Sequence, residues 1–235
     1  MIINAKGPAN FAEKYIIHSI WDGHYPPGSL LPAERELSEH IGITRTTLRE
    51  VLQRLARDGW LTIQHGKPTR VNNFWETSGL NILETLAELD QNGASKLMEN
   101  LLAARKNISM IYIKLAISNN QPALLQFFEE NPLENNAEAF AHFDYLFHHT
   151  FALLSNNPIY VLILNGFKKL HIRGGLYFFK NREARILTEQ YYNDILSIIK
   201  NENENEIDNI VKNYNVKSQP IWQRMRASIA EKYQS

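Results

Sequence analysis

Residues 32–52 of the chain, PAERELSEHIGITRTTLREVL, decide the fold of its N-terminal part. Leu37 and Ile41 have the spacing of one helix face, and Gly42 is typical of a helix end because glycine adopts left-handed backbone conformations. Thr44 is a favoured helix N-cap, so a second helix is expected to begin directly after it. Two short helices at so tight a corner predict a helix-turn-helix, with an ordinary helical hairpin as the alternative.

The first turns of the second helix carry side chains that suit nucleic acid. Arg45, Thr46, Thr47 and Arg49 crowd this end, and no acidic residue follows until Glu50. In a helix-turn-helix the N-terminal residues of the second helix meet base edges and phosphates. In a plain hairpin the same side chains would only be solvated.

A two-stranded wing is predicted after the second helix. Residues 60–63 and 69–71 favour strands, and a turn is expected between them. The tip would offer the imidazole of His65, the bare backbone of Gly66 and the ammonium of Lys67, which suit a groove lined with phosphates. A solvated hairpin tip is the alternative, but its place directly after the helix-turn-helix favours the wing.

Composition limits the remaining possibilities. The 235 residues are 44% apolar, which suits two modest globular domains or one large one, and the formal net charge is zero. Any DNA binding must therefore come from local placement of charge. The chain has no cysteine, which excludes disulfides, zinc thiolates and thiol nucleophiles. It shows no signal-peptide pattern and no long uncharged apolar run, so we expect a cytoplasmic protein.

The rest of the chain predicts a helical bundle. Residues 72–79 have the character of a linker with two aromatic residues. Helical patterns then cover residues 80–89, 97–117, 122–130, 137–154, 158–179, 182–200 and 206–233. The predicted fold is mainly α: a winged helix-turn-helix of three helices and a two-stranded wing in residues 1–71, and a seven-helix bundle in residues 80–235.

One charged residue of the bundle is expected to be buried. Arg105 falls on the apolar stripe of its helix, one turn from Leu101. A charge at such a position must be paired, because burying it alone is costly. Its partner is either a structural carboxylate, such as a glutamate on a neighbouring helix, or a polar or anionic group of a ligand.

The stretch 158–179 is mostly apolar but contains Gly166, Gly174 and Gly175. Glycine costs about 1 kcal/mol in a helix interior, so these residues indicate close packing or reserved space. The alternatives are a kinked, tightly packed core helix and a cavity for an acyl chain. Residues expected to line such a cavity are Leu102, Phe151 and Phe178.

Ser218, Trp222 and Arg226 recur at four-residue intervals near the C-terminus. Ser218 as an N-cap, with Pro220 in the first turn, would leave free N–H groups for a phosphate. With the indole and the guanidinium, this set suits the nucleotide end of coenzyme A. An ordinary surface stripe would look the same.

Residues 32–81 resemble the winged-helix domain of the GntR superfamily of bacterial regulators. The segments IQHGKPTRVNNFWETSGLNILETL and NPIYVLILNG resemble its branch that controls fatty acid metabolism. The resemblance is dense over residues 1–90 and continues to about residue 226. It implies that operator DNA is contacted by Arg35, Thr44, Arg45, Thr46, Thr47 and Arg49 in the major groove and by His65, Gly66, Lys67 and Thr69 from the wing.

The same resemblance implies a long-chain acyl-CoA effector. The positions concerned are Leu102, Arg105, Phe151, Phe178, Asn215, Ser218, Trp222 and Arg226. Three of the family's positions differ: Phe178 stands for a tyrosine, Asn215 for a glycine and Ala227 for a lysine. Arg226 is the candidate substitute for that lysine.

Many GntR relatives with helical sensor domains bind a metal. Asp144 and His148, four residues apart on one helix, would supply half of such a site. The positions expected to hold two further histidines are Tyr192 and Tyr214, and His171 looks a poor replacement. We therefore expect no metal, and expect Asp144 and His148 to be a hydrogen-bonding pair.

The predicted function is that of a homodimeric, acyl-CoA-responsive transcription factor without a cofactor. By resemblance it binds a palindromic operator, represses fatty-acid degradation genes, activates unsaturated fatty-acid synthesis genes and is released by long-chain acyl-CoA. One alternative is a GntR-type sensor of a metal-bound small carboxylate. Another is a helical acyl-CoA enzyme or carrier, which the lack of a nucleophile–base pair or phosphate loop disfavours.

Overall fold

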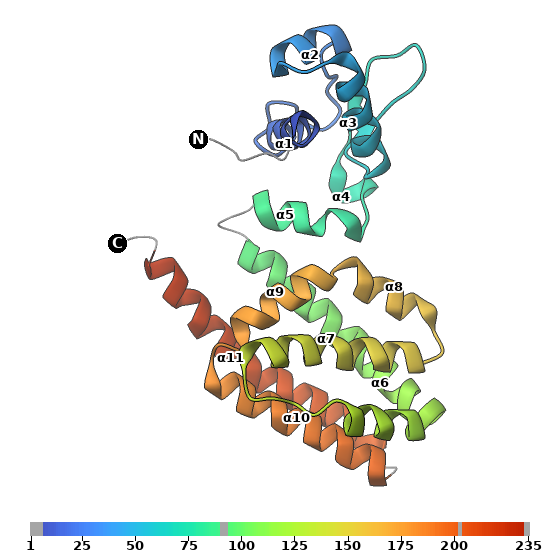
Figure 1. Cartoon of the computed structure of the whole chain (residues 1–235), viewed down its shortest axis with the longest axis vertical. Helices are drawn as coiled ribbons and strands as arrows, with labels where there is room; N and C mark the ends of the chain where they lie inside the picture. Colours follow the sequence, from blue (N-terminus) through green and yellow to red (C-terminus); the bar gives the residue numbers. More distant parts are fainter. Residues whose placement is uncertain (1–6, 90–93, 202–203, 233–235) are drawn as a thin grey trace. The chain divides into compact units, whose positions relative to one another are not determined.

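The computed structural model describes residues 7–89, 94–201 and 204–232, with side chains given in these ranges except for 94–96, 204 and 226–232. The chain forms two compact units, Met1–Asp90 and Gln91–Ser235. Both are mainly helical, as the sequence predicts (Figure 1). Among the described residues, no helix combines the length and the apolar character needed to cross a membrane.

The N-terminal unit is a winged helix with additional helices after the wing. Its elements are α1 (Pro8–Trp21), α2 (Glu34–Ile41), α3 (Arg45–Arg57), β1 (Leu61–Thr62), β2 (Arg70–Val71), α4 (Phe74–Thr77), η1 (Leu80–Ile82) and α5 (Leu83–Leu89). Leu37, Leu48 and Leu55 are almost completely buried where α1, α2 and α3 meet. The apolar stripes predicted for the two helices of the motif therefore form its core.

The corner between α2 and α3 has the predicted local chemistry. Gly42 has φ 79°, the left-handed conformation that ends α2. The Thr44 hydroxyl accepts a hydrogen bond from the backbone N–H of Thr47 at 3.2 Å, so Thr44 is the N-cap of α3. The predicted helix-turn-helix is confirmed.

The wing is a two-stranded antiparallel ribbon in which Leu61 pairs with Val71 and Thr62 with Arg70. A backbone bridge from Leu30 adds to the outer edge of β2. The loop that joins the strands reaches out beside α3 (Figure 1). The strands are shorter than predicted, which leaves residues 63–69 to form a long tip.

Residues 72–79, predicted as a linker, pack against the winged helix. Phe74 is 8% exposed and its ring lies 4.7 Å from that of Trp60. The carbonyl oxygen of Gly59 accepts hydrogen bonds from Asn72 Nδ2 at 3.0 Å and from Thr77 Oγ1 at 2.7 Å. This segment is thus part of the N-terminal unit, to which α5 also belongs, whereas the predicted bundle began at residue 80.

The C-terminal unit is a bundle of helices. Its elements are α6 (Ala94–Glu130), α7 (Ala137–Leu154), α8 (Pro158–Gly166), α9 (Lys168–Phe178), α10 (Arg182–Asn201), η2 (Glu204–Glu206) and α11 (Ile207–Lys232). Helix α7 packs against α6, α8 and α9, while α10 and α11 pack against each other and against α6 (Figure 1).

Helix α6 is broken where the sequence predicts a boundary. Asn120 has φ −157° and ψ 61°, outside the helical region, and Pro122 follows it. The Asn120 side chain accepts a hydrogen bond from the Ala123 N–H at 3.4 Å, so it caps the second segment. The two predicted helices, 97–117 and 122–130, are therefore two segments that meet at a kink.

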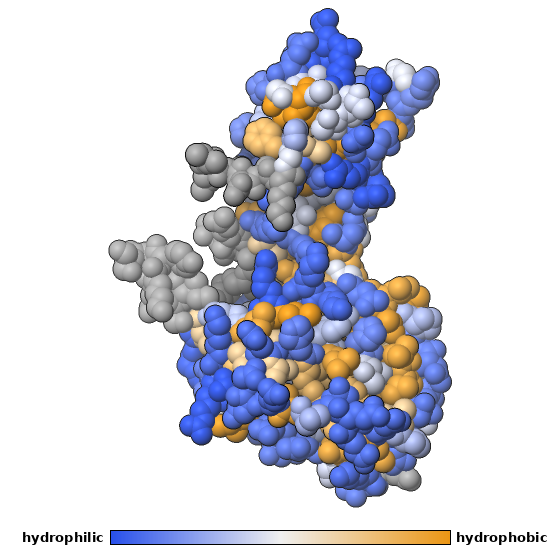
Figure 2. Space-filling view, viewed as in Figure 1, coloured by the Kyte–Doolittle hydropathy of each residue, from blue (hydrophilic) through white to orange (hydrophobic). Residues whose placement is uncertain are grey.

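The prediction of one helix over residues 158–179 is wrong. Phe167, with φ −129° and ψ 19°, separates α8 from α9, and Gly166 ends α8. Within α8 only Leu164 is fully buried, whereas Ile159 and Leu162 are 55% and 63% exposed. Figure 2 shows the resulting apolar surface over α8. The apolar composition of this stretch therefore does not mean that it is a buried core helix.

Candidate functional site

The start of α3 presents the predicted DNA-contacting side chains to solvent. Thr44, Arg45, Thr46 and Arg49 are exposed, and Thr47 is half-buried because its N–H closes the cap. Arg35 of α2 is exposed as well. A helix N-terminus that carries two arginines attracts phosphates through both its dipole and its side chains.

Arg49 has an acidic partner from the neighbouring helix. Its Nε donates to Glu34 Oε2 at 2.6 Å, and the Arg49 and Glu34 side chains are 69% and 40% exposed. Sequence spacing did not show this pair, because the residues lie on different helices. Arg49 must share its guanidinium between Glu34 and any phosphate, whereas no ion pair of Arg45 is found among the described residues.

The wing tip is a tight turn with its polar groups outward. The Lys67 N–H donates to the Gln64 carbonyl at 3.1 Å, and Gly66 takes φ 71°. His65, Gly66 and Lys67 are exposed. Thr69 is half-buried, because its carbonyl accepts a hydrogen bond from Leu31 as part of the ribbon's outer edge.

A cavity of about 340 Å³ lies in the C-terminal unit between α6, α9 and α11. This volume falls within the range of ligand pockets, about 300–1,000 Å³. Of the residues predicted to bind an effector, it brings together Leu102, Arg105, Phe178, Asn215, Ser218 and Trp222.

The other two predicted effector residues are Phe151 and Arg226, and Phe151 does not line this cavity. Phe151 is fully buried in the bundle core, with its ring 4.4 Å from that of Phe147. The side chain of Arg226 lies outside the described residues. An apolar helix position can face the core or a cavity equally well, so spacing could not separate Phe151 from Leu102.

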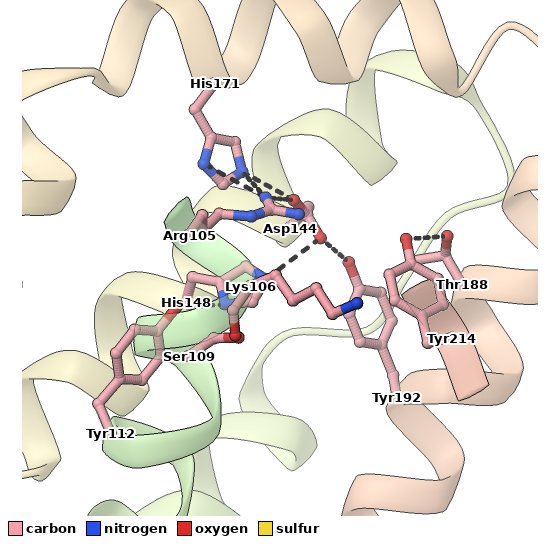
Figure 3. A network of polar contacts seen from close by, with 10 residues as sticks. All are labelled: Arg105, Lys106, Ser109, Tyr112, Asp144, His148, His171, Thr188, Tyr192 and Tyr214. Atoms are coloured by element: carbon pink, nitrogen blue, oxygen red, sulfur yellow. Dashed lines mark hydrogen bonds and ion pairs between the residues drawn. The ribbon is translucent and has the colours of Figure 1, made fainter. Parts of the chain in front are cut away.

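Arg105 forms the polar wall of the cavity together with a buried carboxylate (Figure 3). Its Nη1 donates to Asp144 Oδ2 at 2.8 Å, and the two side chains are 14% and 6% exposed. His171 Nε2 lies 2.7 Å from the same oxygen, and Tyr192 donates to Asp144 Oδ1 at 2.8 Å. The structural partner expected for Arg105 is therefore present, and it is an aspartate.

The charges of this network cancel. Burial alone would raise the pKa of Asp144, but the Arg105 guanidinium and the hydrogen bond from His171 hold that pKa well below its usual value. Burial and the Arg105 charge lower the pKa of His171 and of His148. At neutral pH an ionised carboxylate thus faces a protonated guanidinium and two neutral imidazoles.

The predicted hydrogen bond between Asp144 and His148 is wrong. His148 Nε2 lies 3.8 Å from Asp144 Oδ1, and its Nδ1 instead pairs with the Tyr112 hydroxyl at 2.6 Å. His171, which the sequence disfavoured as a metal ligand, takes the place beside the carboxylate. In the described ranges no group of three or more His, Asp or Glu side chains is arranged to hold a metal ion. The position facing Asp144 is filled by the Arg105 guanidinium.

The predicted N-cap at Ser218 is wrong. Helix α11 runs from Ile207 through Pro220 to Lys232, so Ser218 lies in its interior and exposes no free N–H groups. Its hydroxyl donates back to the Asn215 carbonyl at 3.3 Å. Trp222 does line the cavity, and its Nε1 is buried with no hydrogen-bond partner in the described structure. A ligand acceptor could satisfy this donor.

The two glycines of α9 allow close packing. A Cβ on Gly175 would lie 3.2 Å from Cβ of Ala141 on α7, and one on Gly174 would lie 3.2 Å from the Met98 thioether. Gly175 therefore brings α9 onto α7, as the tight-packing alternative predicted. Gly174 and Met98 both line the cavity.

Family models and relatives match nearly the whole chain. Residues 8–71 match the bacterial regulatory proteins of the gntR family, and residues 72–234 match the FadR C-terminal domain. A fatty acid metabolism regulator protein of Shewanella putrefaciens is 57% identical over 236 residues, covering 98% of this chain and 99% of that protein. A protein of the same name from Shewanella halifaxensis is 58% identical over 227 residues, covering 96% and 95%.

The chain belongs to the fatty acid metabolism regulator family of GntR proteins. It is a transcription factor rather than an enzyme, in keeping with these relatives. A solved structure of Lar, which controls expression of the Listeria monocytogenes agr system, has a TM-score of 0.52 at 19% identity and covers 93% of this chain and 98% of that one. That likeness shows a shared fold only.

Several cavity residues of this GntR protein escaped the sequence prediction. They are Met98, Lys106, Phe167, His171, Tyr214, Gln219 and Gln223. Lys106 and Met98 could have been predicted from the sequence, because each lies four residues from Leu102 on the helix that also carries Arg105, and side chains four residues apart share a helix face. His171 meets Asp144 only through the packing of α9 on α7, and no local pattern predicts such a contact.

Proposed function

We propose that this regulator binds palindromic operator DNA as a homodimer and is released from it by long-chain acyl-CoA. The observation that carries the proposal is the pairing of functions in one chain: an exposed, arginine-bearing helix start in one unit and an effector-sized cavity in the other. A palindromic operator is bound by two symmetry-related DNA-binding domains, which favours a dimer.

The DNA-binding residues divide into two groups by chemistry. Arg45 and Arg35 are suited to bidentate hydrogen bonds with guanine, which give about 1–3 kcal/mol of discrimination each. Thr44, Thr47 and Lys67 suit phosphate contacts that fix register without reading sequence. Arg49 belongs with them, and binding would draw it from Glu34 to a phosphate.

The cavity suits an acyl chain with a polar head. Met98, Leu102 and Phe178 supply apolar walls for the chain, and Arg105 offers hydrogen-bond donors for a carbonyl group. The unpartnered Nε1 of Trp222 is a further donor. An effector that fits one state of the regulator better than another supplies about 1–3 kcal/mol of coupling, enough to weaken operator binding tens-fold.

By this proposal the regulator acts in the cytoplasm, represses fatty-acid degradation genes and activates unsaturated fatty-acid synthesis genes. Fluorescence anisotropy of a labelled palindromic duplex tests the central step. We expect oleoyl-CoA to release the full-length protein, and free coenzyme A or a metal chelator to leave it bound. Release by chelator with indifference to oleoyl-CoA would instead support a metal-bound carboxylate sensor.

A further inference from the structure

Charged side chains in the cavity differ in whether they have partners. Four carboxylate, guanidinium or ammonium groups line it, from Glu99, Arg105, Lys106 and Asp144. Arg105 and Asp144 pair with each other, and Glu99 also has a partner. The ammonium of Lys106 forms no hydrogen bond or ion pair within the described residues, although the side chain is half-buried.

The position of Lys106 along the cavity follows from the packing of α6 on α11. Lys114 and Asp208 form an ion pair at 2.7 Å. Among the lining residues, Lys106 of α6 and Tyr214 of α11 are nearest in sequence to this ion pair, and Met98 and Gln223 are farthest from it, so the two helices run antiparallel past the cavity. Lys114 follows Lys106 by eight positions, a rise of about 12 Å, so Lys106 lies near the level of Asn215.

This level is the polar end of the cavity. Arg105, Asp144, Tyr214 and Asn215 line it together with Lys106, and Figure 3 shows the Lys106 side chain extending on the same side as Tyr192 and Tyr214. The end toward Met98 and Trp222 combines apolar side chains with the polar side chains of Glu99, Asn100 and Gln223. Among the described residues, Lys106 is therefore the cation without a partner at the level of the Arg105–Asp144 pair.

We propose that Lys106 determines the charge of the ligand, by binding an anionic group, a phosphate or a carboxylate, at the polar end of the cavity. The inference rests on the proposed function and specifies which residue of that site selects the ligand. Arg105 is unsuited to this role because Asp144 already neutralises it, which leaves it as a hydrogen-bond donor. An ammonium that is partly removed from water is screened less than a surface lysine, so it favours an anion more strongly.

The proposal predicts discrimination against neutral ligands. Oleoyl-CoA carries phosphates and oleate carries a carboxylate, whereas methyl oleate has the same chain and no charge. Isothermal titration of the full-length protein with each compound measures the difference. The wild-type protein should bind the two anions and bind methyl oleate at least tenfold more weakly.

Two variants of Lys106 and one control locate the effect. Lys106→Gln should weaken oleoyl-CoA binding about tenfold, which corresponds to about 1.4 kcal/mol, and Lys106→Arg should retain most of the affinity. Lys217→Gln removes the same charge from an exposed position of α11 that does not line the cavity, so it should bind like the wild type. A loss confined to oleoyl-CoA identifies phosphate as the bound group, whereas a loss with oleate as well shows that Lys106 also accepts a carboxylate.

The outcomes separate this inference from the proposed function. If the wild type and Lys106→Gln bind oleoyl-CoA equally, or if Lys217→Gln loses as much as Lys106→Gln, the role of Lys106 is refuted while the effector remains. If the wild type binds neither anion, both proposals fail. Salt titrations give a second measurement: the affinity of the wild type for oleoyl-CoA should fall more steeply with salt than that of Lys106→Gln.

Discussion

Replacing Gly59 with alanine should destabilise the N-terminal unit far more than replacing an equally left-handed glycine elsewhere. Gly59 has φ 90°, and a Cβ built on it would lie 2.6 Å from both the Thr77 carbonyl oxygen and the Ser78 Oγ. Two effects add to the loss of unfolding free energy. The left-handed backbone conformation costs about 1–2 kcal/mol for alanine. Overlap of the new Cβ with residues 77 and 78, where the Thr77 hydroxyl also donates to the Gly59 carbonyl, adds about 1–3 kcal/mol.

Gly23 provides the matched control for this prediction. It has φ 77°, and no atom lies within 4 Å of the position its Cβ would take. Gly23→Ala should therefore show only the backbone term. The difference between the two losses measures how tightly residues 77 and 78 are held against the end of α3.

Urea unfolding followed by tryptophan fluorescence measures both losses. In a Trp222→Phe background the three remaining tryptophans, Trp21, Trp60 and Trp75, all belong to the N-terminal unit. We expect Gly59→Ala to lose about 2–5 kcal/mol of unfolding free energy. Equal losses for the two alanine variants would refute the reasoning, because they would show that residues 77 and 78 move away without cost.

Three further predictions concern the proposed DNA contacts and the buried network. Arg45→Ala should cost about 1–3 kcal/mol of binding free energy on operator DNA only. Lys67→Ala should weaken binding to operator and scrambled DNA alike and make the affinity less dependent on salt. Equal losses on both DNAs for Arg45→Ala would contradict the assignment. Asp144→Asn should destabilise the C-terminal unit by about 3–5 kcal/mol, because it leaves the charge of a buried guanidinium without a partner. Adding Arg105→Met should restore part of the lost unfolding free energy, measured by urea titration. No recovery in the double variant would argue against the pairing. The pKa of His148 is lower in the folded chain than in the unfolded chain. Below about pH 6.5 the unfolded chain therefore binds more protons than the folded chain, and the free energy of unfolding should fall as the pH drops through that value. His148→Gln should reduce the fall in urea midpoint, and an unchanged fall would exclude a contribution from this imidazole.

The sequence predicted elements whose ends are set by local chemistry. Gly42 and Thr44 fix the corner of the helix-turn-helix through backbone conformation and a single cap, so neighbouring residues suffice to locate it. Pro122 likewise marked the kink in α6. The same local reasoning failed at Ser218, where the packing of the buried Val211 and Ile221 carries α11 through Pro220.

The candidate site was less predictable, because its contacts join residues far apart in the chain. The stripe on α6 identified Arg105 as a residue that needs a partner, but the partner, Asp144, is 39 residues away and His171 is 66 away. Helical spacing predicts which face of a helix a residue occupies, but it does not predict which residues of other helices pack against that face. Phe151 shows the same limit, since its spacing suits the core in which it lies.

The contacts of residues 72–78 also bear on how this protein can be divided. The two family models meet between residues 71 and 72, but a cut there would remove Phe74 from its contact with Trp60 and both side-chain donors from the Gly59 carbonyl. A Lys14–Glu88 ion pair ties α5 to α1 as well. A DNA-binding fragment or a chimera with another sensor domain should therefore be joined after residue 89, because the evolutionary module and the folding unit end at different places.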